Sequence, residues 1–496
     1  MGKNVGFVGY LIPSMRDVIF VSTFLGVILI GPRTLNIDGD LGRHLTIGNY
    51  TINNFVIPTQ DIFSHTMLGQ PLTPHEWLAQ VFLALSNLSL GLDGVVLLEA
   101  LVVAGTFVIV FRDTLKRSNS ILIAAMLTIW AAAASSLHWI ARPHIFTFLL
   151  IALWTPVIRK IANGDSKYIW APPLIMLIWA NTHGAFISGF VILACFLAGW
   201  FYEYYFTHDK PSPKILKNLL LISGISFAVT LINPVGLDLW STSVGYIQND
   251  YLVSHTQEYF SPNFHLSGTL PFLVLISFSI FILSMGLKKL SFAEGLLVAG
   301  WTAMALYSAR NIPIYAIVAA PILGDYLSNS PARIPAFAKI DSNIRNIETQ
   351  LRGFLWPFAA TVFVVIIFTQ GRVLDAAKLE NNYSSNIFPV EAVNWLEDNP
   401  QTGNMFKYFT WGGYLLYRLW PSQPVFIDGQ TDFYGEELTR EYASSISGDP
   451  LWSEVFRKYQ IRWAIIPKDV PLLSKLVSAG WDILYEDETA ILLRMP

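Results

Sequence analysis

Carboxylate and imidazole side chains crowd into one polar stretch near the N-terminus of a chain that is otherwise mostly apolar. The stretch covers residues 35–77, and its acidic residues and histidines are Asp38, Asp40, His44, Asp61, His65, His75 and Glu76. Such groups accept and donate protons, bind cations and hold polar substrates. We therefore expect this stretch to carry the chemistry and the rest of the chain to position it.

The pair Asp38 and Asp40, separated by Gly39, is the most informative part of this stretch. Two carboxylates so close together can provide a general base, and they allow a divalent cation such as Mg²⁺ or Mn²⁺ to bind without requiring one. The same residue types are ordinary in a solvated turn. The placement of the pair within the whole chain decides between these interpretations.

The composition is that of a polytopic membrane protein. Hydrophobic residues make up 53% of the 496 residues and charged residues only 14%, and the mean hydropathy is +0.46. These values lie outside the usual range of soluble globular proteins. The net charge of −3 provides no basic surface field, so we expect no nucleic-acid partner. The lone Cys195 lies in an apolar run and excludes an intramolecular disulfide.

About eleven apolar segments approach the roughly 20 residues that a helix needs to cross a bilayer. We expect spans near residues 17–30, 94–111, 120–139, 143–158, 168–182, 185–205, 215–232, 268–287, 290–308, 312–327 and 353–370. The first is expected to be a retained signal anchor, because it lacks a clear small-residue cleavage site and many spans follow it.

The segment at residues 76–92 is apolar on most of its face but is interrupted by polar residues. If it does not cross, most Lys and Arg residues of the membrane loops fall on one side, which marks that side as cytoplasmic. We therefore expect an interfacial or re-entrant helix here. The N-terminus is then cytoplasmic, and the first loop and the C-terminal tail lie outside the plasma membrane.

Polar residues gather at the outer ends of the expected spans. Of the nine histidines, only His208 falls in a cytoplasmic loop under this topology. The outer helix ends and loops carry His138, Arg142, His144, Asn181, His183, Asn233, His255, Glu258, His265, Arg310 and Asn311. Ionisable groups at membrane depth are costly and usually line a cavity. The pattern predicts one outward-facing polar cavity beneath the first loop.

The composition changes to that of a soluble domain after residue 370. Helical patterns at residues 390–397 and 472–479, apolar runs at 405–408, 424–427 and 463–466, and a final pair of runs within 481–494 predict a small α/β domain. We therefore expect a transmembrane domain at residues 1–370, with a large first external loop at 31–93. An extracytoplasmic domain follows at residues 371–496.

The sequences DGDLGRHLTIGNY at residues 38–50 and DIFSHTMLGQPLTPHEWLAQ at residues 61–80 resemble the GT-C superfamily of membrane glycosyltransferases. This superfamily includes protein O-mannosyltransferases, aminoarabinose transferases and oligosaccharyltransferases. The resemblance implies an α-helical polytopic membrane protein with a cytoplasmic N-terminus, an acidic motif in the first external loop and a small external α/β domain at the C-terminus. Asp38 and Asp40 occupy the place of that acidic motif.

The resemblance implies an enzyme that moves a sugar from a polyprenyl-phosphate donor to a glycan, lipid or protein acceptor. Asp38 or Asp40 would remove the proton of the acceptor hydroxyl, and a single displacement would invert the anomeric centre. The alternative is a noncatalytic membrane assembly subunit, or a transporter of lipid or polysaccharide. Transporters often carry inverted repeats with broken helices at the midplane, whereas here the polar residues gather at one face and no repeat is evident.

Several side chains are candidates for binding the donor. Arg142, His144 and Arg310 suit a phosphate group, since a guanidinium is a planar fork of donors. Snorkelling or pairing at a helix end is the alternative for each. His75 and Glu76 could hold a lipid headgroup or complete the acidic site, or could simply lie at the membrane interface. They do not form a zinc motif, because no second His follows at the HExxH spacing.

Other polar residues are weaker candidates for substrate or metal. His44 belongs to the polar stretch, and His183 could bind sugar hydroxyls or make interhelical hydrogen bonds. Oligosaccharyltransferases have a Glu in a comparable late external loop that contributes to metal and acceptor binding. That resemblance makes Asp40 and Glu258 the candidate metal ligands, although a solvated surface role is the alternative for Glu258.

The tail contains a further resemblance to oligosaccharyltransferases. Trp411 and Tyr414, in the sequence WGGY, lie where those enzymes carry a Trp-Trp-Asp-Tyr-Gly motif, and substrate binding is expected of them. The central Asp is absent here, so recognition of an asparagine sequon is not implied. Asp428 and Asp432 could line the same cleft or form a turn. No cofactor is expected with certainty, and a divalent ion is the candidate.

Overall fold

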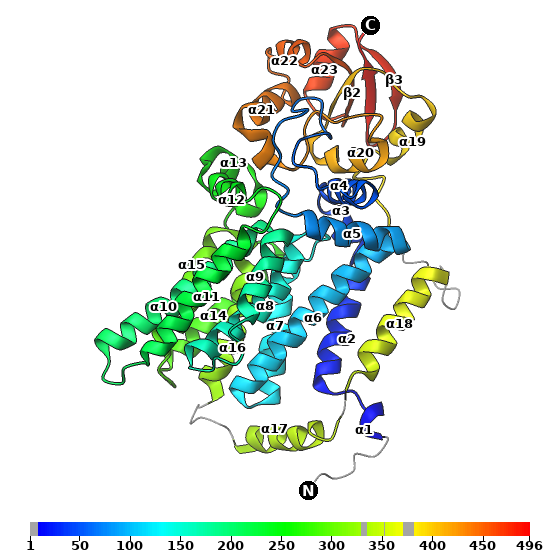
Figure 1. The fold of residues 1–496 in the computed structure, drawn as a ribbon. Coiled ribbons are helices and arrows are strands. Elements are labelled where there is room, and N and C mark those ends of the chain that lie inside the picture. The colour runs from blue at the N-terminus through cyan, green and yellow to red at the C-terminus, as the bar shows by residue number, and fades with distance from the viewer. Residues whose placement is uncertain (1–7, 329–334, 352, 371–380) are drawn as a thin grey trace.

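The computed structural model describes residues 8–328, 335–351, 353–370 and 381–496. Figure 1 shows a long helical bundle with the C-terminal domain at one end and the short helix that begins at Val8 at the other. The expected start of the C-terminal domain at residue 371 lies outside the described residues.

Each segment expected to cross a membrane contains a helix. These helices are α2 (Met15–Leu29), α6 (Leu92–Ser118), α7 (Ile121–Ser135), α8 (His144–Ala162), α9 (Ala171–Thr182), α10 (Ile187–Phe206), α11 (Pro213–Thr230), α14 (Leu270–Ser284), α15 (Phe292–Tyr307), α16 (Ile312–Ser328) and α18 (Leu355–Gln370). Seven helical segments among the described residues are long and apolar enough to cross a membrane. The α-helical membrane architecture is therefore confirmed, and the number of crossings stays a prediction.

Local sequence explains where the helices that lead to the first loop begin and end. Ser14 caps α2 by accepting a hydrogen bond from the backbone N–H of Asp17, whose carboxylate accepts one from the Ser14 N–H. Helix α6 carries Asp93 in its first turn and Lys116 and Arg117 in its last, which suits the helix dipole. Helices α2 and α6 pack side by side (Figure 1), so the chain enters the first loop from a fixed position.

The first loop forms short helices over the end of the bundle that faces the C-terminal domain. Helices α3 (Gly31–Asn36) and α4 (Leu41–Asn54) flank residues 38–40, which we name the acidic turn, and α5 (Trp77–Leu90) follows later. Figure 1 shows α5 lying across the end of the bundle, beside α4. Its 14 residues span about 21 Å, which is shorter than the roughly 30 Å hydrocarbon core of a bilayer.

The C-terminal domain is a small α/β domain, as the sequence predicts. Its sheet has the strand order β1-β2-β4-β3, with β1 (Asn404–Lys407), β2 (Ile461–Ile466), β3 (Asp482–Glu486) and β4 (Ile491–Arg494). Strands β1 and β2 are parallel, and the other two pairs are antiparallel. The helices of the domain are α19 (Val390–Asp398), α20 (Gly412–Leu419), α21 (Thr431–Ile446), α22 (Trp452–Lys458) and α23 (Leu472–Ser478).

The apolar run at residues 424–427 is not a strand of this sheet, contrary to the sequence prediction. It pairs with the first loop instead, because the Val425 N–H donates to the Phe63 carbonyl and the His65 N–H donates to the Val425 carbonyl, both at 3.0 Å. Phe63 is 2% exposed and packs in the same core as Val425. Trp420 Nε1 donates to the Ile62 carbonyl at 3.1 Å. The first loop is therefore part of the core of the C-terminal domain.

The remaining helices lie at the two ends of the bundle. They are α1 (Val8–Leu11) and α17 (Pro335–Glu348) at the N-terminal end and α12 (Asp238–Gln248) and α13 (Asp250–His255) beside the C-terminal domain (Figure 1). Asp341 in α17 accepts a hydrogen bond from Ser120 Oγ at 2.9 Å, which ties α17 to the start of α7.

Candidate active site

The acidic turn is held in place by one arginine from a distant part of the chain. Arg142 lies two residues before α8, and its Nη1 is 2.5 Å from Asp38 Oδ2 while its Nη2 is 2.8 Å from Asp40 Oδ2. The Asp40 N–H also donates to Asp38 Oδ1 at 2.9 Å. Both carboxylates therefore have fixed orientations, and they share one guanidinium.

Glu258 joins this group from a third segment, the short helix η3 (Gln257–Tyr259). Its Oε2 lies 4.0 Å from Arg142 Nη1. Burial raises the pKa of Glu258. The positive charges of Arg310 and Arg142 lower the pKa by a larger amount in total, so its net value is about 2. Glu258 is therefore ionised at neutral pH. The structure brings together these candidates, which the sequence predicted from three separated segments.

Asp38 has the pKa of a general base. Burial raises it, Arg142 lowers it and the nearby Asp40 raises it again, with a net value of about 6 in place of 3.8. A carboxylate with this pKa is ionised at neutral pH, yet it accepts a proton more readily than an ordinary aspartate does.

Glu76 forms a second centre beside the acidic turn. Its Oε2 lies 3.6 Å from Arg43 Nη2, 3.7 Å from His44 Nδ1 and 3.9 Å from His75 Nε2, and its Oε1 lies 3.9 Å from His183 Nε2. These distances are longer than direct hydrogen bonds. Burial and the Arg43 charge hold the pKa of His44 well below its usual range, so its imidazole is neutral at pH 7.

The C-terminal domain contributes residues to this second centre. Arg43 Nη1 donates to Gln430 Oε1 at 2.8 Å, and Arg43 Nε lies 3.8 Å from Asp428 Oδ1. The Gln430 N–H donates to Asp428 Oδ1 at 2.8 Å, which fixes the turn that carries both residues. Asp428 was a predicted cleft candidate, whereas Arg43 and Gln430 were not predicted from the sequence.

Glycines allow the acidic turn and the C-terminal domain to touch through their backbones. A Cβ on Gly429 would lie 1.5 Å from Asp40 Oδ1, and a Cβ on Gly413 would lie 2.2 Å from the Gly39 carbonyl oxygen. A Cβ on Gly42 would in turn meet the Gly413 carbonyl oxygen at 2.2 Å. We name this contact the glycine seam, formed by Gly39, Gly42, Gly413 and Gly429. Any side chain here would separate the two parts.

A buried lysine lies behind the seam and was missed by the sequence analysis. Lys407 is 0% exposed, and its Nζ donates to the Phe409 carbonyl at 2.9 Å. Burial lowers the pKa of Lys407 to about 7, although Asp428 and Asp40 raise it. The only sequence signal for this residue was a basic side chain within an apolar run.

The histidines at the helix ends form one chain of contacts beneath the first loop. His144 Nε2 donates to the His138 carbonyl at 2.8 Å, and the rings of His144 and His183 lie 6.4 Å apart. His183 Nδ1 shares a hydrogen bond with Thr147 Oγ1 at 3.0 Å. Arg310 lies over the Tyr259 ring, with 4.4 Å between Cζ and the ring centroid.

Several candidates lie outside this cluster. Trp411 and Tyr414 are buried in the core of the C-terminal domain, where Trp411 Nε1 donates to the Ile387 carbonyl and the Tyr414 hydroxyl accepts from Arg418 Nη1. Asp61 accepts hydrogen bonds from the backbone of residues 63 and 64 and thus shapes its own turn. The structure does not bring these side chains to the acidic turn.

Asn181 links two helices. It accepts a hydrogen bond from Trp77 Nε1 at 2.7 Å and donates to the Ile232 carbonyl at 3.0 Å. It therefore holds the start of α5, and with it the neighbouring Glu76, against α9.

The candidate metal ligands Asp40 and Glu258 lie on either side of one arginine. No group of three or more His, Cys, Asp or Glu side chains in the described part of the chain is placed to hold a metal ion. The candidate ligands Asp40 and Glu258 both face the guanidinium of Arg142. A cation already occupies the space between them.

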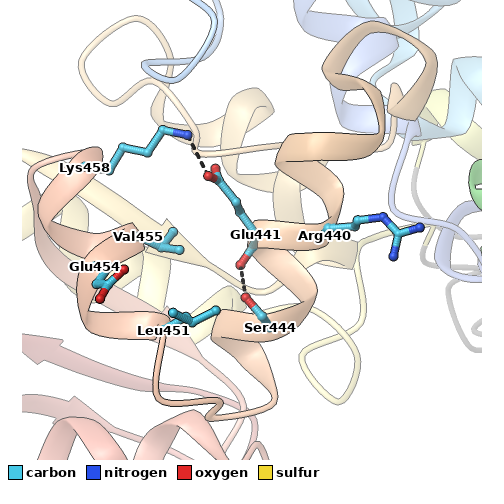
Figure 2. Close-up of a pocket in the computed structure, with 7 residues that line it drawn as sticks. All are labelled: Arg440, Glu441, Ser444, Leu451, Glu454, Val455 and Lys458. Carbon is cyan, nitrogen blue, oxygen red and sulfur yellow. Dashed lines mark hydrogen bonds and ion pairs between the residues drawn. The ribbon is translucent and has the colours of Figure 1, made fainter.

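A separate surface hollow lies on α21 and α22 of the C-terminal domain. Figure 2 shows its lining residues, and its volume is about 490 Å³. Lys458 Nζ donates to Glu441 Oε1 at 2.6 Å across it. A smaller hollow lies beside Glu76 and is lined by Arg43, His75 and Gln430 among others.

The chain thus combines a helical membrane bundle, an acidic turn after its first long helix and an α/β domain packed over that turn. No protein-family model and no curated protein matches the sequence. Solved structures, in contrast, match the fold.

Two of these structures are the oligosaccharyltransferase of Archaeoglobus fulgidus. The form tethered to an acceptor peptide with the NVT sequon has a TM-score of 0.58 and 12% identity, over 90% of this chain and 68% of that chain. The apo form has a TM-score of 0.57 and 14% identity, over 90% and 69%. Apo ArnT from Cupriavidus metallidurans has a TM-score of 0.52 and 10% identity, over 96% and 97%. The likeness confirms the GT-C fold expected from the sequence.

Proposed function

We propose that this protein is a membrane glycosyltransferase that transfers a sugar from a polyprenyl-phosphate donor by inverting displacement. The observation that carries the proposal is the convergence of Asp38, Asp40 and Glu258 on Arg142 at one end of a GT-C bundle. Acidic groups held by a fixed cation, next to buried neutral histidines, suit the activation of a hydroxyl nucleophile.

Asp38 is the proposed general base, because its pKa of about 6 and its partly exposed carboxylate suit proton transfer near neutral pH. The oxygen of the acceptor hydroxyl attacks the anomeric carbon, and its proton passes to Asp38. The bond between the anomeric carbon and the phosphate oxygen breaks, and polyprenyl phosphate leaves with the electron pair. Attack and departure on opposite sides of the carbon invert its configuration.

Arg310 is proposed to bind the departing phosphate, whereas the Nε2–H of His144 already donates to the His138 carbonyl. Arg310 lies in η5 (Ala309–Asn311), directly before α16, and the N-terminus of that helix adds partial positive charge. Arg142 was also a phosphate candidate, but its guanidinium is paired with the acidic turn.

The second centre is proposed to hold the sugar. His44 Nε2 is buried and has no hydrogen-bond partner among the described residues, so it can bind a sugar hydroxyl. Glu76, His75 and His183 surround the same region at distances that leave room for water or a hydroxyl. The acceptor is a glycan, a lipid or a protein, and the polyprenyl chain of the donor would lie in the bilayer.

The site is proposed to face the outside of the plasma membrane. The first loop and the C-terminal domain share a core, so both lie on the same side of the membrane. Helices α1 and α17 lie at the opposite end of the bundle (Figure 1). The bias of Lys and Arg toward that opposite end assigns it to the cytoplasm.

The proposal is tested by replacing Asp38 and Asp40 individually with Asn in the purified full-length protein. Each variant is assayed for sugar transfer from a panel of polyprenyl-phosphate sugars, with Asp469→Asn as the matched control because Asp469 is exposed. We expect roughly a 10²- to 10⁴-fold loss for the base and none for the control. Full activity in both acidic-turn variants would reject the assignment. Lipid bound without any transfer would support the noncatalytic alternative.

A further inference from the structure

Arg142 contacts three acidic side chains that come from two segments of the chain, the acidic turn and η3. Two of its nitrogens lie 2.5 Å from Asp38 Oδ2 and 2.8 Å from Asp40 Oδ2, and Glu258 Oε2 lies 4.0 Å away. The four side chains are 11% to 31% exposed, so water screens them only in part. Oxygen ligands of this kind are what Mg²⁺ and Mn²⁺ prefer.

The carboxylate oxygens of the acidic turn each already face a neighbouring group. Asp38 Oδ2 accepts from Arg142, and Asp38 Oδ1 accepts from the Asp40 N–H at 2.9 Å. Asp40 Oδ2 faces Arg142, while Asp40 Oδ1 lies against Gly429. A divalent ion could reach these oxygens only if the guanidinium moved away, because two positive centres at this separation repel strongly.

The backbone that carries Arg142 is fixed to the segment that carries the acidic turn. The N–H of Ala141 donates to the Thr34 carbonyl in α3 at 3.3 Å, and the Arg142 N–H donates to the Ile140 carbonyl at 2.7 Å. Pro143 follows directly and is the N-cap of α8. The guanidinium therefore reaches the acidic turn from a rigid base.

We propose that Arg142 is the resident cation of the acidic site and fills the place between Asp38, Asp40 and Glu258 that a divalent ion would otherwise take. Arg142 is then a positioning residue, since it orients both carboxylates and supplies one fixed positive charge. The inference rests on the proposed function only in placing these carboxylates at the reacting centre. It replaces the expectation that Asp40 and Glu258 bind Mg²⁺ or Mn²⁺.

The test measures Mn²⁺ binding to the purified full-length protein by electron paramagnetic resonance, with neither donor nor acceptor present. We compare the wild type with Arg142→Met, with Arg142→Lys, with Asp40→Asn, and with Arg142→Met combined with Asp40→Asn. Arg462→Met, a change at an exposed arginine, is the control. We expect no saturable site in the wild type, the Lys variant or the control. In Arg142→Met we expect one site, about a hundredfold tighter than any wild-type binding and lost when Asp40 is also replaced.

Two results would overturn the proposal. One is saturable Mn²⁺ binding to the wild type that Asp40→Asn abolishes, and the other is a folded Arg142→Met variant with no gain in binding. If Arg142→Met does not fold, the wild-type measurement alone decides, because Asp40-dependent binding contradicts the proposal and its absence supports it. The result is independent of whether sugar transfer is detected, so it is distinguishable from a failure of the proposed function.

Discussion

Replacing Gly429 by Ala tests whether the C-terminal domain completes the active site. The added Cβ would lie 1.5 Å from Asp40 Oδ1 and 2.5 Å from Asp40 Cγ, whereas ordinary contact begins near 3.4 Å. Gly429 is not among the residues with positive φ, so alanine causes no backbone strain there. The substitution therefore acts through one steric conflict with one carboxylate.

The size of the conflict sets the expected loss. Either Asp40 or the loop that carries Gly429 must move by about 2 Å, and a misplacement of about 1 Å at a reacting centre can cost roughly 10²-fold in rate. We expect kcat for sugar transfer to fall by at least about 10²-fold. The seam should also loosen, which lowers the melting temperature.

The assay uses the purified full-length protein, with transfer from polyprenyl-phosphate sugars and thermal unfolding measured on the same samples. Gly268→Ala is the matched control, because a Cβ on Gly268 meets nothing within 4 Å. The double variant Asp40→Ala, Gly429→Ala should regain stability but not activity, since it removes the group that the new methyl meets. Unchanged transfer and unchanged melting in Gly429→Ala would refute the role of the seam.

Three further predictions follow from the same contacts. The kcat/KM for sugar transfer should fall about tenfold per pH unit below pH 6 and level off above pH 6, because Asp38, with a pKa of about 6, must be deprotonated. A flat profile down to pH 4 would exclude Asp38 as the base. The pKa of Lys407 is about 7 in the folded protein and 10.5 in the unfolded chain, so the free energy of unfolding should rise between pH 7 and 10 by up to about 1.4 kcal/mol per pH unit. Thermal melts of Lys407→Met should lack that rise. Phe63→Ala should destabilise the C-terminal domain by roughly 3–5 kcal/mol, measured by denaturant unfolding, whereas a stability equal to wild type would contradict the shared core.

The sequence predicted the helices and the gathering of polar groups at one end, because both follow from local apolar patterns and from sidedness. The predicted topology places the outer helix ends and loops at one end of the bundle. The structure brings Asp38, Arg142 and Glu258 together there, although they lie far apart in the chain. The hydrogen bond between Arg43 and Gln430 joins residues 387 positions apart, and no periodicity encodes such a contact.

The errors and omissions have the same physical origin. The apolar run at residues 424–427 has the pattern of a strand, but its partner is the first loop rather than the sheet. Trp411 and Tyr414 match a substrate motif in their types, yet their side chains fill a core. Lys407 is buried by tertiary packing alone, so its altered pKa has no local signature.

Phe63 lies in the first loop but packs in the core of the C-terminal domain, so this early part of the chain can complete its folding only after the last part has been synthesised. Residues made early in synthesis must wait until the last hundred or so residues emerge on the same side of the membrane before their hydrophobic partners exist. A chimaera that takes its C-terminal domain from a homologous chain would consequently also need residues 55–76 of that chain. Without them, the core of the domain would have a cavity in place of the Phe63 ring.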